Sequence, residues 1–327
     1  MKVLLADAFE KAGLDALASL GYEVQYHPGC GTDAIPKLVA EGTPRVLVVR
    51  STKVPAAGVN AAADAGVGLI VRAGAGVDNI DVGAATMRGV RVANCPGMNS
   101  VAVAELTMGL LLECDRRLAD QTIAARGGSW NKKEFAKARG LKGMTLGVVG
   151  CGAIGRAVIK RAVAFEMDVV AWSRSITPEH ARDLGARWGG NDTPALLSLA
   201  SASHAVSIHL PAAADTNRLI GKTFFDAMRP GSYFINTSRG SIVDEAALRD
   251  AVRSKGLRAG LDVFDNQPPA AQAEWKNETA ALPGVYCTHH CGASTDQAQE
   301  AIARETVRVI QVYAATGRAE NCVNPAG

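Results

Sequence analysis

Two side chains in the second half of the chain can act directly on a small anionic molecule. Arg239 follows an apolar run and precedes a glycine, which is typical of the strand end where open α/β sheets bind ligands. A guanidinium there can hold a carboxylate and polarise an adjacent carbonyl. His290 carries an imidazole, which titrates near neutrality and can therefore give or take a proton. The two residues predict acid–base chemistry on an anionic carbonyl or alcohol.

A glycine pattern predicts a dinucleotide site. Gly150, Gly152 and Gly155 form G-x-G-x-x-G after an apolar strand and before a helical pattern. The first glycine permits a tight turn, the second lets the backbone approach a pyrophosphate, and the third allows close packing of helix on strand. Ala153 and Ile154 begin the helix, whose free N–H groups suit phosphate oxygens.

The residues after the next strand bear on the choice of cofactor. This pattern normally has an acid about 20 residues on, which holds the ribose 2′-hydroxyl. Here the strand ends in Ser173, Arg174 and Ser175. A guanidinium and two hydroxyls can bind a 2′-phosphate, so the sequence favours NADP over NAD. The alternative is that Arg174 is a solvated surface residue and the protein accepts either cofactor.

The elements that must position these residues alternate between short apolar strands and helical segments. Continuous apolar runs are typical of parallel strands buried on both faces, and the alternation predicts doubly wound α/β lobes. Two long helices are expected, one from Asn99 to Ala125 opened by an Asn-Ser cap, the other Thr295–Thr316 stopped by Gly317. The expected strands are Val3–Ala6, Glu23–Tyr26, Val46–Arg50, Leu69–Arg72, Val90–Asn94, Leu146–Gly150, Val169–Trp172, Ala205–His209, Tyr233–Thr237, Ala259–Phe264 and Val285–Thr288.

Length and composition limit the class of protein. A chain of 327 residues with 48% hydrophobic residues fits two domains. A net charge of +3 is too small and too dispersed for nucleic acid binding. No apolar run reaches the ~20 residues of a membrane span, and the first residues lack a signal peptide. The seven cysteines are scattered, which predicts a reducing, cytoplasmic environment and no metal site.

The chain resembles the D-isomer-specific 2-hydroxyacid dehydrogenase family, and within it the 3-phosphoglycerate dehydrogenases. The resemblance runs from about Val46 to the end, through VLVVRSTKV, VRAGAGVDNID, NCPGMNSVAVAELT, FINTSRGSIVDEAAL, GLDVFDNQPP and HHCGAST. It implies a flavodoxin-like substrate domain of residues 1–98 and 295–327, and an inserted Rossmann NAD(P)-binding domain of residues 99–294. It also implies a homodimer formed through the helix after Asn99. The chain stops soon after its last helix, so we expect no C-terminal regulatory domain.

The resemblance assigns roles to particular residues. Arg239 would hold the carboxylate of a small anionic 2-hydroxy or 2-oxo acid. His290, rather than its neighbour His289, would be the acid–base group for hydride transfer at C2. The other implied cofactor residues are His209, Leu210, Pro211, Thr216, Thr237, Ser238, Asp262, which would lie near the nicotinamide, and Gly292.

The same resemblance predicts how the substrate is held. Ala75 and Gly76 would bind the substrate carboxylate through backbone N–H groups, and Asn99 would lie in the same site. Arg50 and Arg72 match positions near the distal phosphate of phosphoglycerate, which suits a dianionic substrate. The alternative is that these arginines are paired with nearby acids.

One residue departs from the family pattern. Gln267 stands where the family has a glutamate beside the catalytic histidine, so the expected set is Arg239, Gln267 and His290. Without a full negative charge beside it, His290 should stay neutral to lower pH. Formate dehydrogenases of the superfamily have a similar Gln–His pair, so hydride abstraction from formate is an alternative function. A nucleotide-sensing binding protein, like the co-repressors of this fold, is another.

Overall fold

The protein contains two separate α/β units. The structure is a computed structural model that describes residues 1–268 and 272–324. One unit comprises Met1–Asn99 and Ser294–Gly327, and the other comprises Ser100–Ala293. Each unit has one sheet in which all the strands pair in parallel. The predicted fold class, two doubly wound parallel-sheet lobes, is confirmed.

The sheet of the first unit has the order β2-β1-β3-β4-β5, which is the flavodoxin-like order. Its strands are β1 (Lys2–Leu5), β2 (Glu23–Tyr26), β3 (Val46–Val49), β4 (Leu69–Arg72) and β5 (Arg91–Ala93). Its helices are α1 (Lys11–Ser19), α2 (Ile35–Gly42), α3 (Ala56–Asp64), α4 (Val82–Met87) and α13 (Asp296–Thr316), with a short 3-10 turn η1 (Thr32–Ala34).

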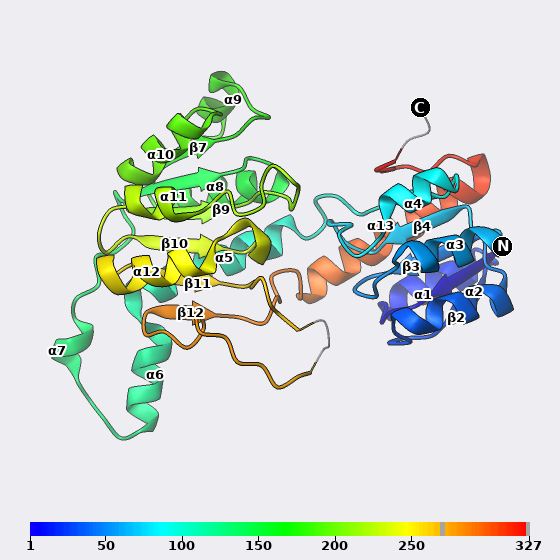
Figure 1. Cartoon of the computed structure of the whole chain (residues 1–327), viewed down its shortest axis with the longest axis horizontal. Helices are drawn as coiled ribbons and strands as arrows, with labels where there is room; N and C mark the ends of the chain where they lie inside the picture. Colours follow the sequence, from blue (N-terminus) through cyan, green and yellow to red (C-terminus); the bar gives the residue numbers. More distant parts are fainter. Residues whose placement is uncertain (269–271, 325–327) are drawn as a thin grey trace. The chain divides into compact units, whose positions relative to one another are not determined.

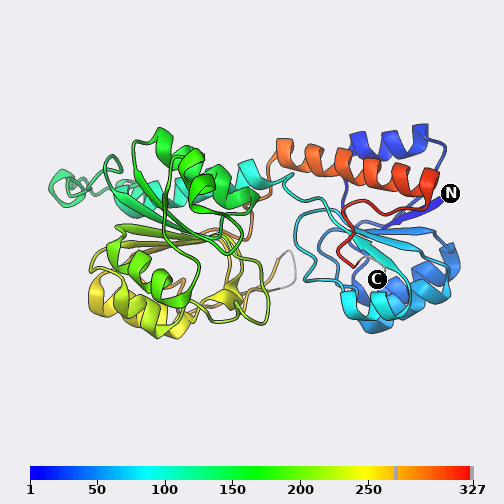
Figure 2. The same ribbon diagram turned by 90° about the horizontal axis from the view of Figure 1, so that it is seen from above.

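Alternate side chains of these strands enter two different cores. Val3 and Leu5 pack with α1 and α13, whereas Leu4 and Ala6 pack with α2, α3 and α4. Figure 2 shows α1 and α13 on one face of this sheet and the other helices on the opposite face. The continuous apolar runs are therefore explained, because both faces of each strand are covered.

The sheet of the second unit has the order β12-β11-β10-β9-β6-β7-β8 (Figure 1), a Rossmann order extended by one strand. Its strands are β6 (Thr145–Val149), β7 (Asp168–Trp172), β8 (Arg187–Trp188), β9 (Ala205–Ile208), β10 (Tyr233–Asn236), β11 (Arg258–Leu261) and β12 (Val285–Cys287). Its helices are α5 (Ser100–Arg116), α6 (Leu118–Arg126), α7 (Lys132–Phe135), α8 (Ala153–Ala164), α9 (Pro178–Asp183), α10 (Thr193–Ala202), α11 (Lys222–Ala227) and α12 (Glu245–Lys255), with the 3-10 turn η2 (Gly240–Ile242).

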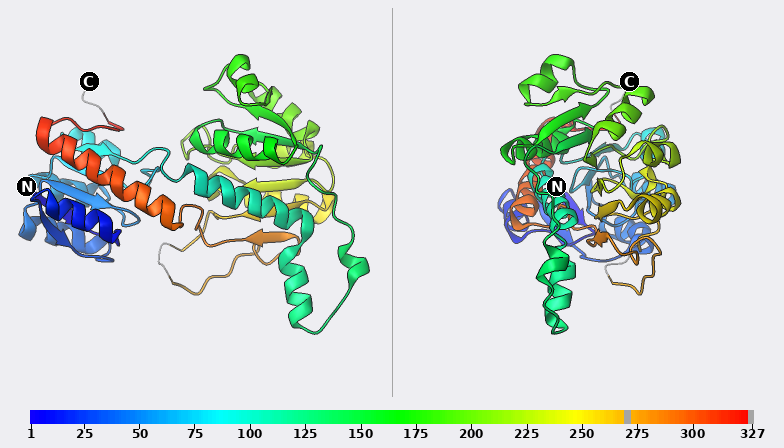
Figure 3. Two further views of the ribbon diagram at one scale, coloured as in Figure 1. Left: turned by 180° about the vertical axis from the view of Figure 1, so that it is seen from behind. Right: turned by 90° about the vertical axis from the view of Figure 1, so that its left-hand side faces the viewer.

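Helices cover both faces of this sheet too. Buried residues of α5, α8 and α9 form one core with alternate strand side chains, and those of α10, α11 and α12 form the other. Figure 3 shows α5 and α8 together on one face. The carboxyl ends of all these parallel strands meet at one edge of the sheet, where the predicted site residues follow β6, β7, β9, β10, β11 and β12.

The single helix expected from Asn99 to Ala125 is wrong. Helix α5 ends at Arg116 and α6 begins at Leu118, because Arg117 adopts left-handed backbone angles with φ 54°. This conformation costs about 1–2 kcal/mol for a residue with a Cβ. In this conformation the Arg117 side chain forms ion pairs with Asp120 (2.9 Å) and Glu134 (2.6 Å).

Two smaller expectations also differ from the structure. Strand β8 was not predicted, since two residues at a sheet edge carry no periodicity. The Asn-Ser cap of α5 is wrong, because Asn99 Oδ1 and Ser100 Oγ are buried without a hydrogen-bond partner among the described residues. By contrast, α13 begins after the capping residue Thr295, whose hydroxyl accepts the Ala298 N–H, and ends before Gly317 at φ 70°, as predicted.

Candidate active site

The three glycines after β6 each meet a different steric demand. Gly150 has φ 97°, and a Cβ there would lie 2.4 Å from the carbonyl oxygen of His209. A Cβ on Gly155 would lie 2.0 Å from the carbonyl oxygen of Gly150, so only glycine lets α8 pack this closely on the turn. A Cβ on Gly152 would meet nothing within 4 Å, which leaves open space at the backbone.

The start of α8 has the properties of a phosphate site. Ala153 and Ile154 lie in its first turn, where backbone N–H groups have no acceptor within the helix. These donors, the positive end of the helix dipole and the open space at Gly152 suit a dinucleotide diphosphate. The geometry therefore fits the predicted cofactor, although contact with it stays a prediction.

The residues after β7 form a small polar cluster. The hydroxyls of Ser173 and Ser175 are 3.0 Å apart, and the Ser175 N–H donates to Ser173 Oγ at 3.2 Å. Arg174 Nη1 lies 2.5 Å from Asp215 Oδ2, and both side chains are more than half exposed. Arg174 holds the pKa of Asp215 below its usual range, chiefly through this hydrogen bond. An exposed pair of this kind contributes little to stability.

Asp215 is the residue that sequence reasoning missed. The glycine pattern predicts an acid directly after β7, and none stands there. The structure supplies a carboxylate from the loop after β9, 41 residues further along the chain. No spacing rule connects the two loops, so only the fold reveals that Arg174 has an acidic neighbour.

The loop after β9 is held by its own side chains. His209 Nε2 lies 2.8 Å from Ser207 Oγ, and burial lowers the pKa of His209 to about 3, so the ring is neutral. Thr216 Oγ1 donates to the Pro211 carbonyl at 2.7 Å and thereby closes the loop, while Leu210 is buried in the core. The structure thus shows His209 and Thr216 shaping the loop, and their contact with a cofactor stays a prediction.

Arg239 lies in a tight polar turn after β10. Asn236 Oδ1 accepts the Ser238 N–H (3.0 Å) and hydroxyl (2.7 Å), and Asn236 Nδ2 donates to the Arg239 carbonyl at 2.9 Å. The Thr237 hydroxyl lies 2.9 Å from that of Thr107 on α5. This network fixes the backbone from which the half-buried guanidinium extends.

The turn that carries Arg239 packs on the loop that carries Gln267. A Cβ on Gly240 would lie 2.1 Å from the carbonyl carbon of Phe264 and 2.2 Å from the nitrogen of Asp265. Only glycine allows these two backbones to approach so closely. The two loops are therefore packed directly against each other at this point.

Gln267 and His290 are in direct contact. Gln267 Nε2 lies 2.6 Å from His290 Nδ1, and Gln267 Oε1 accepts the Phe264 N–H at 3.2 Å. Because the amide oxygen is engaged by the backbone, the atom beside the ring is the amide nitrogen, which can only donate. Nδ1 is then the acceptor, and a neutral His290 carries its proton on Nε2. The predicted pairing of these side chains is present in the structure.

Asp262 holds the loop that presents His290. Its Oδ1 accepts the Thr288 hydroxyl (2.6 Å) and the Cys291 N–H (2.8 Å), and its Oδ2 accepts the Gly292 N–H (2.9 Å). The Asp262 carbonyl accepts the His290 N–H at 2.8 Å, and His290 itself has φ 51°. The buried carboxylate therefore stabilises a loop whose histidine adopts an unusual backbone conformation.

Three neighbouring strands carry the main residues of this site at their carboxyl ends. Arg239 follows β10, Asp262 follows β11 and His290 lies three residues after β12, and these strands are adjacent in the sheet. A cationic group for a carboxylate and a proton carrier thus extend from the same sheet edge as the glycine turn.

The first unit carries the residues predicted to bind substrate. Arg50 follows β3 and is half-buried. The guanidinium of Arg72 lies against Gly74, where a Cβ would be 1.4 Å from its Nη1. Asn94 Nδ2 donates to the Ala75 carbonyl at 2.5 Å, which holds the loop that continues to Gly76. Whether these groups touch a substrate stays a prediction, as it does for Asn99.

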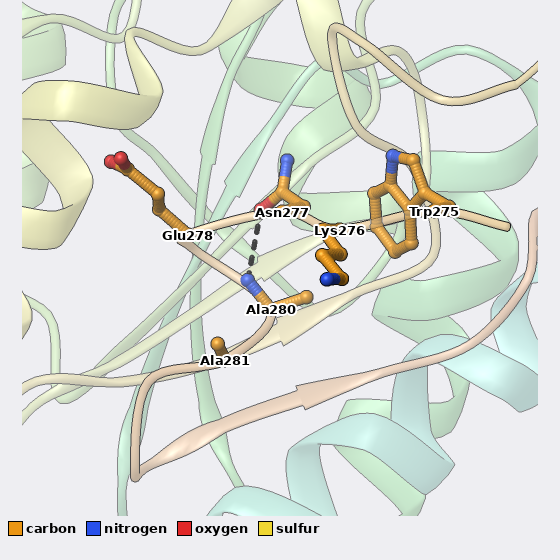
Figure 4. Close-up of a pocket in the computed structure, with 6 residues that line it drawn as sticks. All are labelled: Trp275, Lys276, Asn277, Glu278, Ala280 and Ala281. Atoms are coloured by element: carbon orange, nitrogen blue, oxygen red, sulfur yellow. Dashed lines mark hydrogen bonds between the residues drawn. The ribbon is translucent and has the colours of Figure 1, made fainter.

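A surface cavity of about 530 Å³ lies elsewhere in the second unit (Figure 4). Its lining residues are Trp275, Lys276, Asn277, Glu278, Ala280 and Ala281. None of the predicted site residues lines it. The segment is instead tied to the Gln267 loop, because Glu245 accepts both the Asp265 N–H (2.8 Å) and the Asn277 amide (3.2 Å).

Within residues 1–268 and 272–324, no group of three or more His, Cys, Asp or Glu side chains could hold a metal ion. Over the same residues, the helices are too short or too polar for any of them to traverse a bilayer.

Comparison with known proteins decides the family. The family model for the D-isomer specific 2-hydroxyacid dehydrogenase, NAD binding domain, matches residues 108–292. The chain belongs to the D-isomer-specific 2-hydroxyacid dehydrogenases. The match spans the glycine turn, the Arg239 turn and the His290 loop, so the family's nicotinamide cofactor is expected in the second unit.

Relatives of the family cover nearly the whole chain. It is 37% identical over 301 residues to D-3-phosphoglycerate dehydrogenase of Archaeoglobus fulgidus, covering 91% of this chain and 54% of that protein. It is 40% identical over 280 residues to hydroxypyruvate reductase of Thermotoga maritima, covering 85% and 87%. The crystal structure of NAD⁺-bound 3-phosphoglycerate dehydrogenase of Entamoeba histolytica matches with a TM-score of 0.80 at 25% identity, covering 99% of each chain. The chain thus spans little more than half of the first of these relatives.

Proposed function

We propose that the protein transfers hydride between a nicotinamide cofactor and C2 of a small anionic 2-hydroxy or 2-oxo acid. The observation that carries this proposal is the placement of Arg239 and the Gln267–His290 pair after adjacent strands β10, β11 and β12. Relatives named phosphoglycerate dehydrogenase and hydroxypyruvate reductase act on acids of this class. A bound nicotinamide would supply or accept the hydride.

The side chains have separate tasks in this mechanism. The Arg239 guanidinium binds the substrate carboxylate and withdraws charge from the C2 oxygen. In its protonated form, His290 gives the Nε2 proton to that oxygen as hydride reaches C2, which completes the alcohol and leaves the ring neutral. Gln267 keeps the ring in this orientation, and Asp262 keeps the loop in place.

NADP is the proposed cofactor. Ser173, Arg174 and Ser175 offer a guanidinium and two hydroxyls to a 2′-phosphate, and the exposed Asp215 can be displaced. We propose further that Arg50 and Arg72 bind a second anionic group on the substrate. A distal phosphate is the favoured group, since D-3-phosphoglycerate dehydrogenases are among the relatives.

A formate-dehydrogenase-like activity is the second candidate. The Gln267 amide donates to Nδ1, so an imidazolium at His290 would require the amide to turn and lose its bond to Phe264. Hydride abstraction from formate needs no such proton. A spectrophotometric screen of NADPH oxidation with 2-oxo acids, and of NADP⁺ and NAD⁺ reduction with formate, separates the two functions.

A homodimer is also proposed. Helix α6 and the residues after it extend from the body of the second unit (Figure 3). They expose Leu118, Ile123 and Trp130, with Ile123 68% and Trp130 88% accessible. Apolar side chains gathered on one projecting segment mark a candidate interface, and a second copy of the chain is the proposed partner.

A further inference from the structure

The carboxylate of Asp7 organises the loop that carries Arg50. Asp7 follows β1, and Arg50 follows the neighbouring strand β3. Asp7 Oδ2 accepts the backbone N–H groups of Arg50 (2.6 Å), Ser51 (3.1 Å) and Thr52 (3.0 Å), and Oδ1 accepts the Thr52 hydroxyl at 3.0 Å. One side chain therefore fixes three consecutive peptide groups more than 40 residues away.

Three N–H groups that converge on one oxygen form the kind of concave site that binds anions. Here the chain fills this site with its own carboxylate. The backbone of the loop is thus unavailable to a substrate anion, which leaves binding to the side chains. Hydrogen bonds to a carboxylate are charge-assisted and short, so they hold the Arg50 backbone more firmly than neutral bonds would.

The remainder of the loop is held independently. Asn79 Nδ2 donates to the Thr52 carbonyl at 2.8 Å, and the Val54 N–H donates to the Asn79 carbonyl at 2.7 Å. Asp7 therefore governs the first part of the loop, from which the Arg50 side chain extends, while Asn79 governs the second. Loss of the Asp7 carboxylate should loosen Arg50 without releasing the whole loop.

We propose that Asp7 is a positioning residue for the second anionic group of the substrate, acting through Arg50. The inference rests on the proposed function, in which Arg50 binds that group. The expected effect is selective, since a loosened Arg50 weakens binding of a substrate with a distal anion and leaves the counterpart that lacks this anion unaffected. Because the contact is the same in ground and transition states, KM should change and kcat should not.

The test compares two substrates that differ only in the phosphate, 3-phosphohydroxypyruvate and hydroxypyruvate. Asp7→Asn keeps the shape and removes the charge. It should raise KM for the phosphorylated substrate about tenfold or more and change KM for hydroxypyruvate less than twofold. Asp81→Asn is the matched control, because Asp81 caps α4 in the same unit by accepting the Ala84 N–H at 2.8 Å and should leave the ratio of the two KM values unchanged.

A double-mutant cycle shows whether Asp7 acts through Arg50. If it does, Asp7→Asn adds little to Arg50→Ala in the double variant. Equal increases in KM for both substrates, additive effects in the cycle, or a lower KM for the phosphorylated substrate would each overturn the inference. An unmutated protein that prefers hydroxypyruvate would instead overturn the proposed role of Arg50 itself.

Discussion

The side-chain amide of Gln267 lies 2.6 Å from Nδ1 of His290 and faces it with a donor, since its oxygen accepts the Phe264 N–H. A glutamate at this position would instead accept a hydrogen bond from a protonated Nδ1 and stabilise the imidazolium. The difference of one atom therefore determines which nitrogen of His290 carries the proton.

Gln267→Glu should move the pH profile of kcat/KM upward by about one unit. Reduction, which uses the protonated ring, should persist to higher pH. Oxidation, which uses the neutral ring, is lost as the pH falls, and this loss should begin at a higher pH than in the unmutated protein. The measurement is kcat/KM against pH in both directions. Asp265→Asn is the control, since Asp265 is an exposed carboxylate of the same loop and its backbone N–H donates to Glu245. A profile that responds to Asp265→Asn alone would remove Gln267 from this role.

The Arg174–Asp215 pair predicts opposite effects of two substitutions on cofactor choice. Arg174→Ala should raise KM for NADPH roughly tenfold or more and change KM for NADH little, because a charge-assisted bond to the 2′-phosphate is lost. Asp215→Asn should lower KM for NADPH, because Arg174 no longer has a competing carboxylate. Steady-state kinetics with both cofactors tests this, and equal efficiency of the unmutated protein with NADPH and NADH would rule out the preference.

Burial of His209 predicts a pH-dependent stability. Its pKa is lowered to about 3, whereas an unfolded histidine titrates near 6.5. Between these values only the unfolded chain binds the proton, so the free energy of unfolding falls as pH falls, by up to about 1.4 kcal/mol per unit. His209→Gln removes this pH-dependent contribution to the free energy of unfolding. The variant should therefore be destabilised most at pH 7, and urea denaturation should show the deficit shrinking towards pH 5. A deficit that is constant with pH would contradict the buried neutral histidine.

The exposed apolar residues of α6 predict the oligomeric state. Ile123→Asp should convert a dimer into a monomer, because an aspartate in an apolar interface would be buried without a partner. Light scattering after size-exclusion chromatography measures the mass directly. Met87→Asp is the control, since Met87 on α4 is 82% exposed and belongs to the other unit. A monomeric unmutated protein would refute the proposal.

Local patterns predicted much of the fold. The run Val46–Val49 forms β3 because both faces are covered, and α13 ends where Gly317 permits a left-handed residue. The break at Arg117 could not be predicted, because the left-handed residue is accompanied by an ion pair to Glu134, 17 residues later, which no local pattern predicts. Helix propensity alone predicts one continuous helix here, because good helix formers stand on both sides of Arg117.

Some residues of the candidate site could likewise be predicted from local patterns, and others could not. Gly150, Arg239 and His290 stand in local motifs, so sequence alone located them, and the Gln267–His290 contact followed from the family pattern. Asp215 and Asp7 act on residues 41 and 43 positions away. Asp7 reaches Arg50 because β1 and β3 are neighbours in the sheet, whereas Asp215 reaches Arg174 across the intervening strand β6. No spacing in the chain predicts either pairing.

The most direct test of the account is the oxidation of NADPH by 2-oxo acids, followed by absorbance with the unmutated protein and with Arg239→Gln. We predict turnover with 2-oxo acids, fastest with one that carries a distal phosphate, and loss of kcat/KM by at least a hundredfold in the variant, since the carboxylate loses its charged partner. NADPH binding without turnover on any 2-oxo acid, or cofactor reduction by formate alone, would contradict the account.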